Sequence, residues 1–317
     1  MKVLIIPSFY PDFLNKNIGV FFKEQVDYLN DFGLDLDVIY VEQKSLRKLN
    51  FSNIFNNHYQ FKTILRKASK DYRLLGWKMP GYLGSKLWIL LMEILFKRYI
   101  KINGIPDLIH AHNIFNGGIV AFNLSKKYNI PYIITEHDSA FLNTDFSIKQ
   151  KNIIKNIYSN SSKIISVSNS LKAQINKIVQ NIEIEVIPNV VNNLFQVSYK
   201  EIPEIKKNIE FISIGNLNKN KGHDFLIDAF KLVSKKHQNI FLRICGDGPE
   251  KMKLLKKIST LKLENKVKLL GHLNKKDVLK NLLKSDCLVH TSHVETFGIV
   301  LVEALSQGIP IITTNSG

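Results

Sequence analysis

The sequence predicts an α/β protein made of two Rossmann-like domains whose parallel sheets face each other across a cleft. Its 317 residues exceed one ordinary core and suit two domains of roughly 150 residues each. Short apolar runs alternate with stretches in which apolar residues recur at helical spacing, and this alternation stops and restarts once. Strands that alternate with helices form parallel sheets covered on both faces.

The first half of the chain carries the alternation from its first residues. Residues 2–7 are four apolar residues between Lys2 and Pro7, which is typical of a buried strand and too short for the apolar region of a signal peptide. Further strands are expected at 35–41, 107–111, 131–135, 163–167 and 185–187, and helices at 19–32, at 118–128 and from 168 onward.

A polar stretch at 197–208, which contains Pro203 and shows no clear period, predicts a linker. It separates an N-terminal domain at 1–196 from a C-terminal domain at 209–317. In the second domain strands are expected at 210–214, 240–245, 266–270, 287–290 and 310–313, and helices at 222–236, 250–261, 275–283 and 299–306.

The net charge of +17 is concentrated in a basic aromatic insertion at about 44–101. This segment holds thirteen Lys or Arg residues against two acids, and ten aromatic residues. Bases mixed with aromatics are typical of an anionic membrane surface, of nucleic acid, or of an ordinary solvated face. The membrane surface is favoured because the motifs described below indicate an acceptor that is displayed at a membrane. Nucleic acid is the least favoured partner.

No segment is expected to span a membrane. The most hydrophobic stretch, 87–96, would cover about a third to a half of a bilayer and is interrupted by Glu93. Cys245 and Cys287 each lie in an apolar run that is typical of a strand, so the sequence predicts a protein of the reducing cytoplasm.

Ligands of open parallel sheets bind beyond the carboxyl ends of the strands, so the turns that follow strands are the candidate sites. The turn 215–223 places Lys221 immediately before a helix, where a cation and free N–H groups favour an anion. The next strand ends in Cys245-Gly246-Asp247-Gly248-Pro249, which is either a tight turn that allows close approach of a ligand or a plain strand-to-helix turn.

Two carboxylates give the sharpest signal. Glu295 precedes a glycine-containing helix start, and Glu303 lies eight residues further on, inside an otherwise apolar helix. A carboxylate in that position is costly without partners, so the pair indicates hydroxyl-rich ligand groups such as a sugar. The alternative is that Glu303 forms a structural ion pair.

These motifs together resemble glycosyltransferase family 4, the retaining glycosyltransferases of GT-B fold. The resemblance covers the whole chain, although the family continues beyond the end of this sequence, so a fragment of a longer protein is expected. It rests on Glu295/Glu303 with Thr296-Phe297-Gly298 between them, Gly246–Pro249, Lys221-Gly222, Asn17-Ile18-Gly19, His110-Ala111-His112, Thr135-Glu136-His137-Asp138 and Ile187-Pro188-Asn189.

The resemblance implies a role for each of these positions. Glu295 would bind hydroxyls of the donor sugar, and His137 would sit at the reacting sugar. Lys221, Phe297, Gly298 and Gly19 would contact the diphosphate of the donor. Glu303 would bind the ribose hydroxyls, and Gly246, Gly248 and Gly271 would lie beside the base. Asn216 stands where the family commonly has arginine, so one diphosphate contact loses its charge. No metal and no cofactor would be required, and the chain lacks an Asp-x-Asp triplet.

The sequence therefore predicts a retaining glycosyltransferase that moves a sugar from a nucleotide diphosphate donor, UDP-sugar being favoured, to a glycan or lipid-linked acceptor. The acceptor is expected at the inner face of the plasma membrane, in bacterial surface polysaccharide synthesis. The rival interpretations are a nucleotide-sugar epimerase, a catalytically silent nucleotide- or membrane-binding scaffold, and a nucleic-acid binder.

Overall fold

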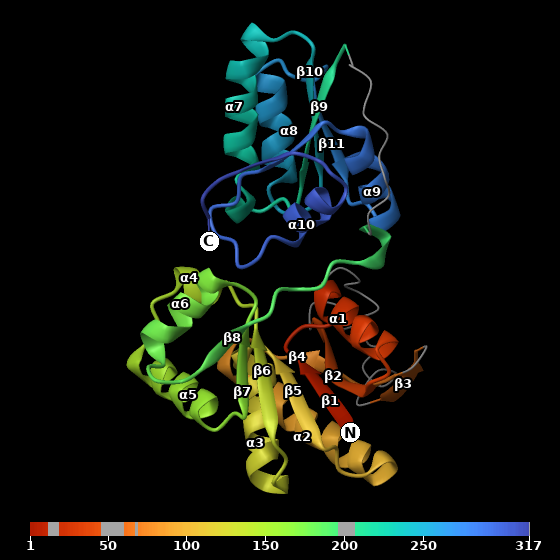
Figure 1. Ribbon diagram of the computed structural model, residues 1–317, viewed down its shortest axis with the longest axis vertical. Helices are drawn as coiled ribbons and strands as arrows, with labels where there is room; N and C mark the ends of the chain where they lie inside the picture. Colours follow the sequence, from red (N-terminus) through yellow and green to blue (C-terminus); the bar gives the residue numbers. More distant parts are fainter. Residues whose placement is uncertain (12–18, 46–59, 67–68, 196–206, 317) are drawn as a thin grey trace. The chain divides into compact units, whose positions relative to one another are not determined.

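The computed structural model describes residues 1–11, 19–45, 60–66, 69–195 and 207–316 (Figure 1). The chain divides into two compact units, Met1–Val190 and Val191–Gly317. Each contains a mostly parallel sheet with helices between its strands, so the predicted α/β class with two Rossmann-like sheets is confirmed. The predicted cleft between the sheets stays a prediction.

The first unit is built on an eight-stranded sheet in the order β3-β4-β2-β1-β5-β6-β7-β8. All neighbouring strands are parallel except β3, which pairs antiparallel with β4. The central strand β1 is apolar and almost wholly buried, as expected for a parallel strand covered on both faces. The strands are β1 (Lys2–Pro7), β2 (Asp35–Ser45), β3 (Phe61–Leu65), β4 (Lys70–Lys78), β5 (Leu108–His112), β6 (Tyr132–Glu136), β7 (Lys163–Ser166) and β8 (Ile184–Val186).

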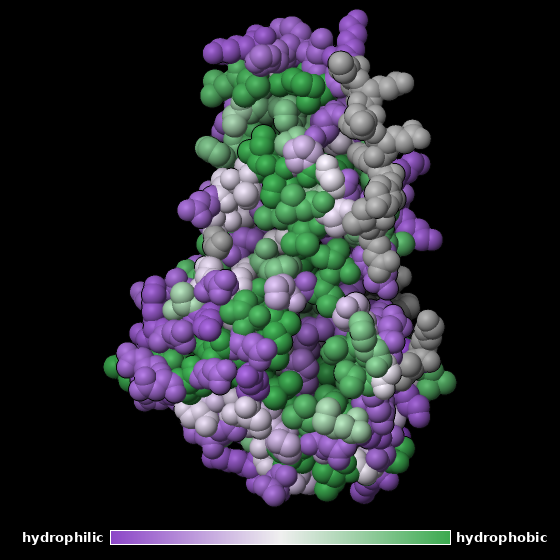
Figure 2. Space-filling model, viewed as in Figure 1, coloured by the Kyte–Doolittle hydropathy of each residue, from purple (hydrophilic) through white to green (hydrophobic). Residues whose placement is uncertain are grey.

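Helices connect these strands and cover the sheet (Figure 1). The longest, α2, packs against β2, β4 and its neighbour α3. The outer side of α5 and α6 is hydrophilic, and purple side chains gather over it in Figure 2. The helices are α1 (Val20–Asp31), α2 (Gly81–Asn103), α3 (Ile119–Tyr128), α4 (Ala140–Asn143), α5 (Ile148–Ser159) and α6 (Asn169–Ile178). The segment η2 (Ile114–Gly118) precedes α3 and has a non-helical backbone at Phe115 and Asn116.

The interpretation of 44–101 as an insertion is wrong for the part that the structure describes. β4 pairs in parallel with β2 from Asp37↔Lys70 to Ser45↔Lys78, so it widens the sheet, and α2 then packs on that sheet. Five aromatic side chains of this part belong to the core, since Tyr72, Trp77, Trp88, Phe96 and Tyr99 are buried, whereas Phe61 on β3 is half-buried. Three further aromatic residues of the basic aromatic segment, Phe51, Phe55 and Tyr59, lie outside the described residues.

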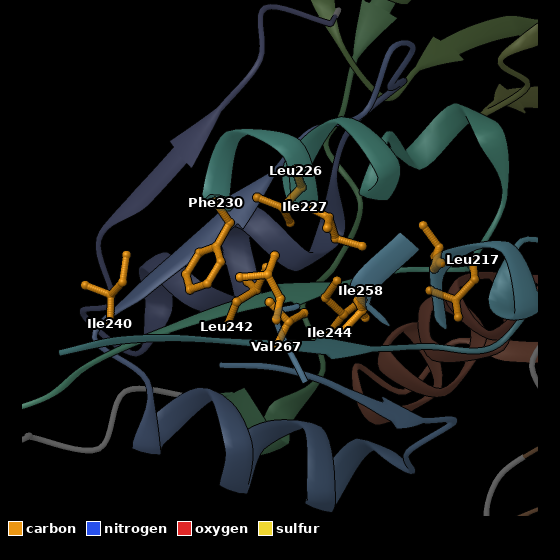
Figure 3. Packing of buried hydrophobic residues seen from close by; sticks show 11 residues of the cluster. Leu217, Leu226, Ile227, Phe230, Ile240, Leu242, Ile244, Ile258 and Val267 are labelled. Carbon is orange, nitrogen blue, oxygen red and sulfur yellow. The ribbon is translucent and has the colours of Figure 1, made fainter. Parts of the chain in front are cut away.

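The second unit carries a five-stranded parallel sheet in the order β11-β10-β9-β12-β13. Apolar side chains of β9–β11, α7 and α8 interlock on one face, where Phe230, Ile227 and Leu242 lie close together (Figure 3). Its elements are η3 (Asn193–Phe195), β9 (Ile209–Ile214), η4 (Lys219–Lys221), α7 (His223–Lys236), β10 (Ile240–Cys245), α8 (Lys251–Thr260), β11 (Val267–Gly271), α9 (Lys275–Lys284), β12 (Cys287–His290), α10 (Ile299–Ser306) and β13 (Ile311–Thr313).

The boundary between the units lies at Val190/Val191, before the predicted domain end at 196. Phe195 explains the difference, because its buried ring packs in the core of the second unit with Ile212 and Leu288. Its carbonyl oxygen also accepts a hydrogen bond of 2.8 Å from Gln307 Nε2.

Both cysteines are buried and free, on β10 and β12 as predicted. Within the described residues, no helix has both the length and the apolar character needed to cross a bilayer.

Candidate functional site

In the second unit the turn after β9 delivers Lys221 to the carboxyl edge of the sheet. The short helix η4 begins after Asn218, whose side chain accepts a hydrogen bond from Lys221 N, and α7 follows from Gly222. Gly222 has φ +61°, and a Cβ there would lie 2.2 Å from the carbonyl oxygen of Thr291. Only glycine therefore allows this turn to approach the segment that follows β12.

Side-chain hydrogen bonds fasten the two segments together. Thr291 Oγ1 donates to the carbonyl oxygens of Lys221 and Gly222 at 3.0 and 3.1 Å. Asn220 Nδ2 donates to the carbonyl oxygen of Val294, whose N–H donates back to Asn220 Oδ1. Because both segments follow neighbouring strands, these bonds hold the turns after β9 and β12 as one structure.

The two charged candidates of these turns meet directly. Lys221 Nζ lies 2.6 Å from Glu295 Oε2, and both side chains are about four-fifths buried. The same carboxylate oxygen contacts His290 Nε2 at 3.0 Å and accepts a longer bond of 3.4 Å from Ser292 Oγ. The backbone N–H of Glu295 donates to the carbonyl oxygen of Ser316 at 2.9 Å. The structure thus brings Lys221 and Glu295 together and adds His290, while the predicted contacts of Lys221 and Glu295 with a donor stay predictions.

The environment of Glu295 holds it ionised. Burial by itself raises the pKa of this carboxyl, but the hydrogen bond from His290 and the Lys221 ammonium outweigh burial and lower the pKa to about 2. At neutral pH the site therefore contains a fixed carboxylate beside a fixed ammonium, in a setting that water reaches only partly.

Glu303 lies on α10, which begins after Gly298, a residue with φ +74°. Its side chain is buried and forms an ion pair with Lys275 of α9. Lys275 Nζ also lies 5.5 Å above the ring of Phe195. The structure therefore contains the ion pair that the sequence left as the alternative, and a contact of Glu303 with ribose stays a prediction.

The glycines of the Gly246–Pro249 turn have a structural reason to be glycine. A Cβ on Gly246 would lie 1.9 Å from the carbonyl oxygen of Gly215, and one on Gly248 would lie 2.5 Å from that of Leu217. This turn must therefore pack its backbone directly on the turn that carries Lys221. Gly271, in contrast, has φ +73° and open space around the position of a Cβ.

Asn216 is exposed in the turn after β9 that carries Lys221, and Phe297 is half-buried just before α10. Neither has a contact in the described residues that assigns it a role, so their predicted donor contacts stay predictions.

In the first unit three histidines cluster where β5 and β6 end. The rings of His110 and His112 lie 4.5 Å apart between centroids, and His112 Nδ1 shares a hydrogen bond of 3.2 Å with His137 Nε2. Phe21 and Phe22 of α1 pack on this cluster, with ring centroids 5.2 and 4.9 Å from that of His137.

These imidazoles are neutral at physiological pH. Burial lowers the pKa of His110 to about 4. Burial and repulsion from His110 lower the pKa of His137 to about 3, although an interaction of His137 with Asn189 acts in the opposite direction. Although Asn189 is near enough to affect this pKa, no hydrogen bond of good geometry from the described residues reaches His137 Nδ1. That buried nitrogen is a polar group suited to a ligand.

Glu136, beside His137, has a structural role that the sequence did not show. Its carboxylate accepts hydrogen bonds from the N–H groups of Ile114, His137 and Asp138 and from Tyr158 Oη, all between 2.8 and 3.0 Å. Burial raises its pKa to about 7 in spite of these bonds. Glu136 thereby holds the loops after β5 and β6 around the histidine cluster.

Gly19, the predicted glycine of the N-terminal loop, caps α1 with φ +69°. A Cβ there would lie 2.7 Å from the carbonyl oxygen of Phe9. The close approach is thus to the chain's own backbone, and an approach to diphosphate stays a prediction.

Two residues at these sites, His290 and Lys275, were not predicted. His290 ends a predicted strand, which is the position that the carboxyl-edge rule favours, whereas Lys275 gives no signal in sequence. Among the described residues, no three His, Cys, Asp or Glu side chains are arranged to hold a metal ion.

Known structures share this architecture over the whole chain. Sucrose-phosphate synthase from Thermosynechococcus elongatus matches with a TM-score of 0.77 at 16% identity, covering 100% of this chain and 82% of that one. Anabaena HepE, solved in complex with UDP and glucose, matches with a TM-score of 0.69 at 20% identity, covering 100% and 81%. The fold is that of the GT-B glycosyltransferases.

Sequence comparison then gives the family. The model "Glycosyltransferase Family 4" matches residues 18–193, and "Glycosyl transferases group 1" matches 196–317. The chain belongs to glycosyltransferase family 4, as the sequence motifs predicted.

Curated relatives agree with this assignment. An uncharacterized glycosyltransferase of Methanocaldococcus jannaschii is 36% identical over 225 residues, which cover 70% of this chain and 59% of that protein. A putative teichuronic acid biosynthesis glycosyltransferase of Bacillus subtilis is 27% identical, covering 100% of this chain and 82% of that protein. The chain thus spans about three fifths of the archaeal relative's length.

Proposed function

We propose that this protein transfers a sugar from a nucleotide diphosphate sugar to a glycan or lipid-linked acceptor, with retention of the anomeric configuration. The observation that carries the proposal is the Lys221–Glu295 contact at the carboxyl edge of the second sheet. The ammonium can bind a phosphate, and the carboxylate beside it can accept hydrogen bonds from sugar hydroxyls. The two groups are close enough to bind both parts of one sugar phosphate.

Lys221 can serve the diphosphate without leaving Glu295. An ammonium has three donors, of which one is directed at Glu295 Oε2. The others can face phosphate oxygens as charge develops on the leaving nucleotide, and the start of α7 adds backbone N–H groups. The proposed reaction therefore needs no metal and no cofactor.

Glu295 is suited to the sugar hydroxyls of the donor. It is ionised, so it only accepts hydrogen bonds, and His290 and Lys221 keep one of its oxygens in place. We propose that Gly246, Gly248, Gly271 and Glu303 line the nucleoside, as the family resemblance implies.

His137 is proposed to contact the reacting sugar through Nδ1. A neutral imidazole can donate or accept a hydrogen bond there without repelling a cationic sugar at the transition state. The hydrogen bond that His137 Nε2 shares with His112 Nδ1 orients the ring for this contact. Gly19, Asn216, Phe297 and Gly298 complete the proposed donor contacts.

UDP is the favoured nucleotide because the structurally similar HepE was solved in complex with UDP and with UDP-glucose. Surface polysaccharide synthesis at the inner face of the plasma membrane is favoured by the Bacillus subtilis relative, whose name refers to teichuronic acid biosynthesis. A cytoplasmic location, peripheral at that membrane, fits both.

Calorimetric titration with UDP, GDP and ADP, followed by NMR of the product formed from each nucleotide sugar, tests the proposal. UDP is expected to bind most tightly, and the product to keep the donor's anomeric configuration. An inverted product would contradict retention, and interconversion of donor sugars without acceptor would indicate an epimerase. Unchanged transfer by the Glu295→Ala variant would overturn the assigned site. UDP binding by the wild type without transfer from any of the three donors would leave the silent scaffold.

A further inference from the structure

The solvent side of α2 exposes large apolar side chains, although a surface helix is ordinarily polar on that side. Leu83, Leu90 and Ile94 expose 65%, 54% and 41% of their area. The opposite side of the same helix is buried in the core of the first unit, through residues such as Trp88 and Phe96. A helix between core and water ordinarily carries polar residues outward, so these exposed side chains indicate a partner.

Lysines alternate with these apolar residues on the same face. Leu83, Lys86, Leu90, Ile94, Lys97 and Lys101 follow one another at spacings of three or four residues, and all six are exposed. This spacing aligns them on one side of the helix over about 27 Å. We call these six residues the α2 outer face.

The α2 outer face contains no acid. The helix has a single acidic residue, Glu93, which is half-buried beside the face. The surface therefore combines three positive charges with three large apolar side chains, and its partner should be both anionic and apolar.

We propose that the α2 outer face docks on the surface of an anionic bilayer, with the helix lying in the interface. Apolar side chains would enter the headgroup–acyl boundary while the lysines meet lipid phosphates, each adding about 1 kcal/mol of attraction. This proposal deepens the proposed function, because it names the face that would bring the enzyme to a membrane acceptor. It rests on the proposed function only for the reason why docking would be useful.

Two other occupants fit the same face less well. A second copy of the chain would oppose lysines to lysines across a two-fold axis. Single-stranded nucleic acid is bound by stacking on exposed aromatic rings, whereas Tyr72, Trp77, Trp88, Phe96 and Tyr99 are buried.

The position of α2 in the fold relates the face to the proposed chemistry. The helix connects two parallel strands, β4 and β5, so it begins at the carboxyl edge of the sheet and runs back along it. His112, the last residue of β5, and His137, which follows β6, lie at that same edge. The Leu83 end of the α2 outer face therefore adjoins the edge where an acceptor is expected to react.

Co-sedimentation of the full chain with vesicles tests the proposal. Vesicles of phosphatidylglycerol and phosphatidylcholine in equal parts should bind at least tenfold more tightly than vesicles of phosphatidylcholine alone. The triple variant Lys86→Glu/Lys97→Glu/Lys101→Glu, and separately Leu90→Gln/Ile94→Gln, should each weaken this binding at least tenfold. The control, Lys149→Glu/Lys151→Glu/Lys155→Glu on the exposed side of α5, makes the same change in charge on the same unit and should bind as the wild type does.

The outcomes that overturn the proposal are distinct. If the α2 and α5 lysine variants lose vesicle affinity equally, the attraction depends on the net charge of the protein and not on the α2 outer face. If both α2 variants bind vesicles as the wild type does, the α2 outer face is not the docking surface. A dimer that Leu90→Gln/Ile94→Gln dissociates would assign the face to self-association. Transfer to a soluble acceptor should survive the α2 substitutions, so absence of transfer in the wild type with intact vesicle binding would contradict the proposed function alone.

Discussion

Lys221 and Glu295 are 74 residues apart in sequence, yet the ammonium and the carboxylate lie 2.6 Å from each other. The contact joins the turn after β9 to the turn after β12, which are adjacent strands of the second sheet. Thr291 and Asn220 fasten the same two turns through the backbone. The charge pair is thus held by a rigid frame, and a donor that enters the site meets groups already in position.

Lys221→Ala should weaken UDP binding about tenfold to a hundredfold, because a charge-assisted hydrogen bond to phosphate is worth about 1.5–3 kcal/mol. Transfer should slow with it, since the same charge serves the bound and the transition state. Calorimetry measures the affinity. Lys236→Ala, at the exposed far end of α7, is the matched control. Equal affinities for the two variants would remove Lys221 from the diphosphate site.

The low pKa of Glu295 predicts a pH-dependent contribution to stability. The folded-state pKa is lowered from 4.5 to about 2, so the contribution is present above pH 4.5 and is lost as the pH falls towards 2. From about pH 5 to about pH 3 the wild type should lose about 2 kcal/mol of unfolding free energy more than Glu295→Gln does. Urea titrations at both pH values measure this difference. Parallel losses in the two proteins would show that His290 and Lys221 do not depress this pKa.

Gly222→Ala should destabilise the protein by about 3 kcal/mol and displace Lys221 from Glu295. Two costs add up: a left-handed backbone costs an alanine about 1 kcal/mol, and the new Cβ would lie 2.2 Å from Thr291 O, which forces the turn to move. Gly308→Ala is the control, because Gly308 has φ +67° but open space around a Cβ. It should cost about 1 kcal/mol and leave UDP affinity unchanged. Thermal unfolding and calorimetry measure both effects, and similar results for the two variants would contradict the close approach.

Buried parallel strands are the part of the fold that the sequence predicted well. β1, β10 and β12 begin and end at the predicted residues, because a strand covered on both faces is a continuous apolar run between polar turns. β4 was missed because its sequence contains Asp71 and Arg73. These charges are buried and pair with each other and with Arg66 and Glu42, and such pairing depends on tertiary contacts that no local pattern records.

In the candidate sites, too, the sequence predicted which residues lie at strand ends but not the contacts that depend on the tertiary structure. Lys221 and Glu295 were predicted together because both follow strands at the edge where ligands bind, but their mutual contact depends on the Gly222 turn. The histidines of the first unit were predicted as residues at strand ends, whereas the bond between His112 and His137 depends on the pairing of β5 with β6. Glu303 was expected to need a partner, and sequence could not show that α9 supplies it.

Glu303 and Lys275 allow a structural role to be separated from a role in binding. Lys275→Met should destabilise the second unit by about 3 kcal/mol, because it leaves a buried carboxylate without this ammonium, while UDP affinity should change little. Glu303→Gln removes the charge that needs the partner, so it should cost less stability but weaken UDP binding about tenfold if the carboxylate accepts ribose hydroxyls. Urea unfolding and calorimetry on both variants measure the two effects. An unchanged UDP affinity in Glu303→Gln would contradict the ribose contact, and a stable Lys275→Met protein would show that the ion pair does not hold α9 to α10.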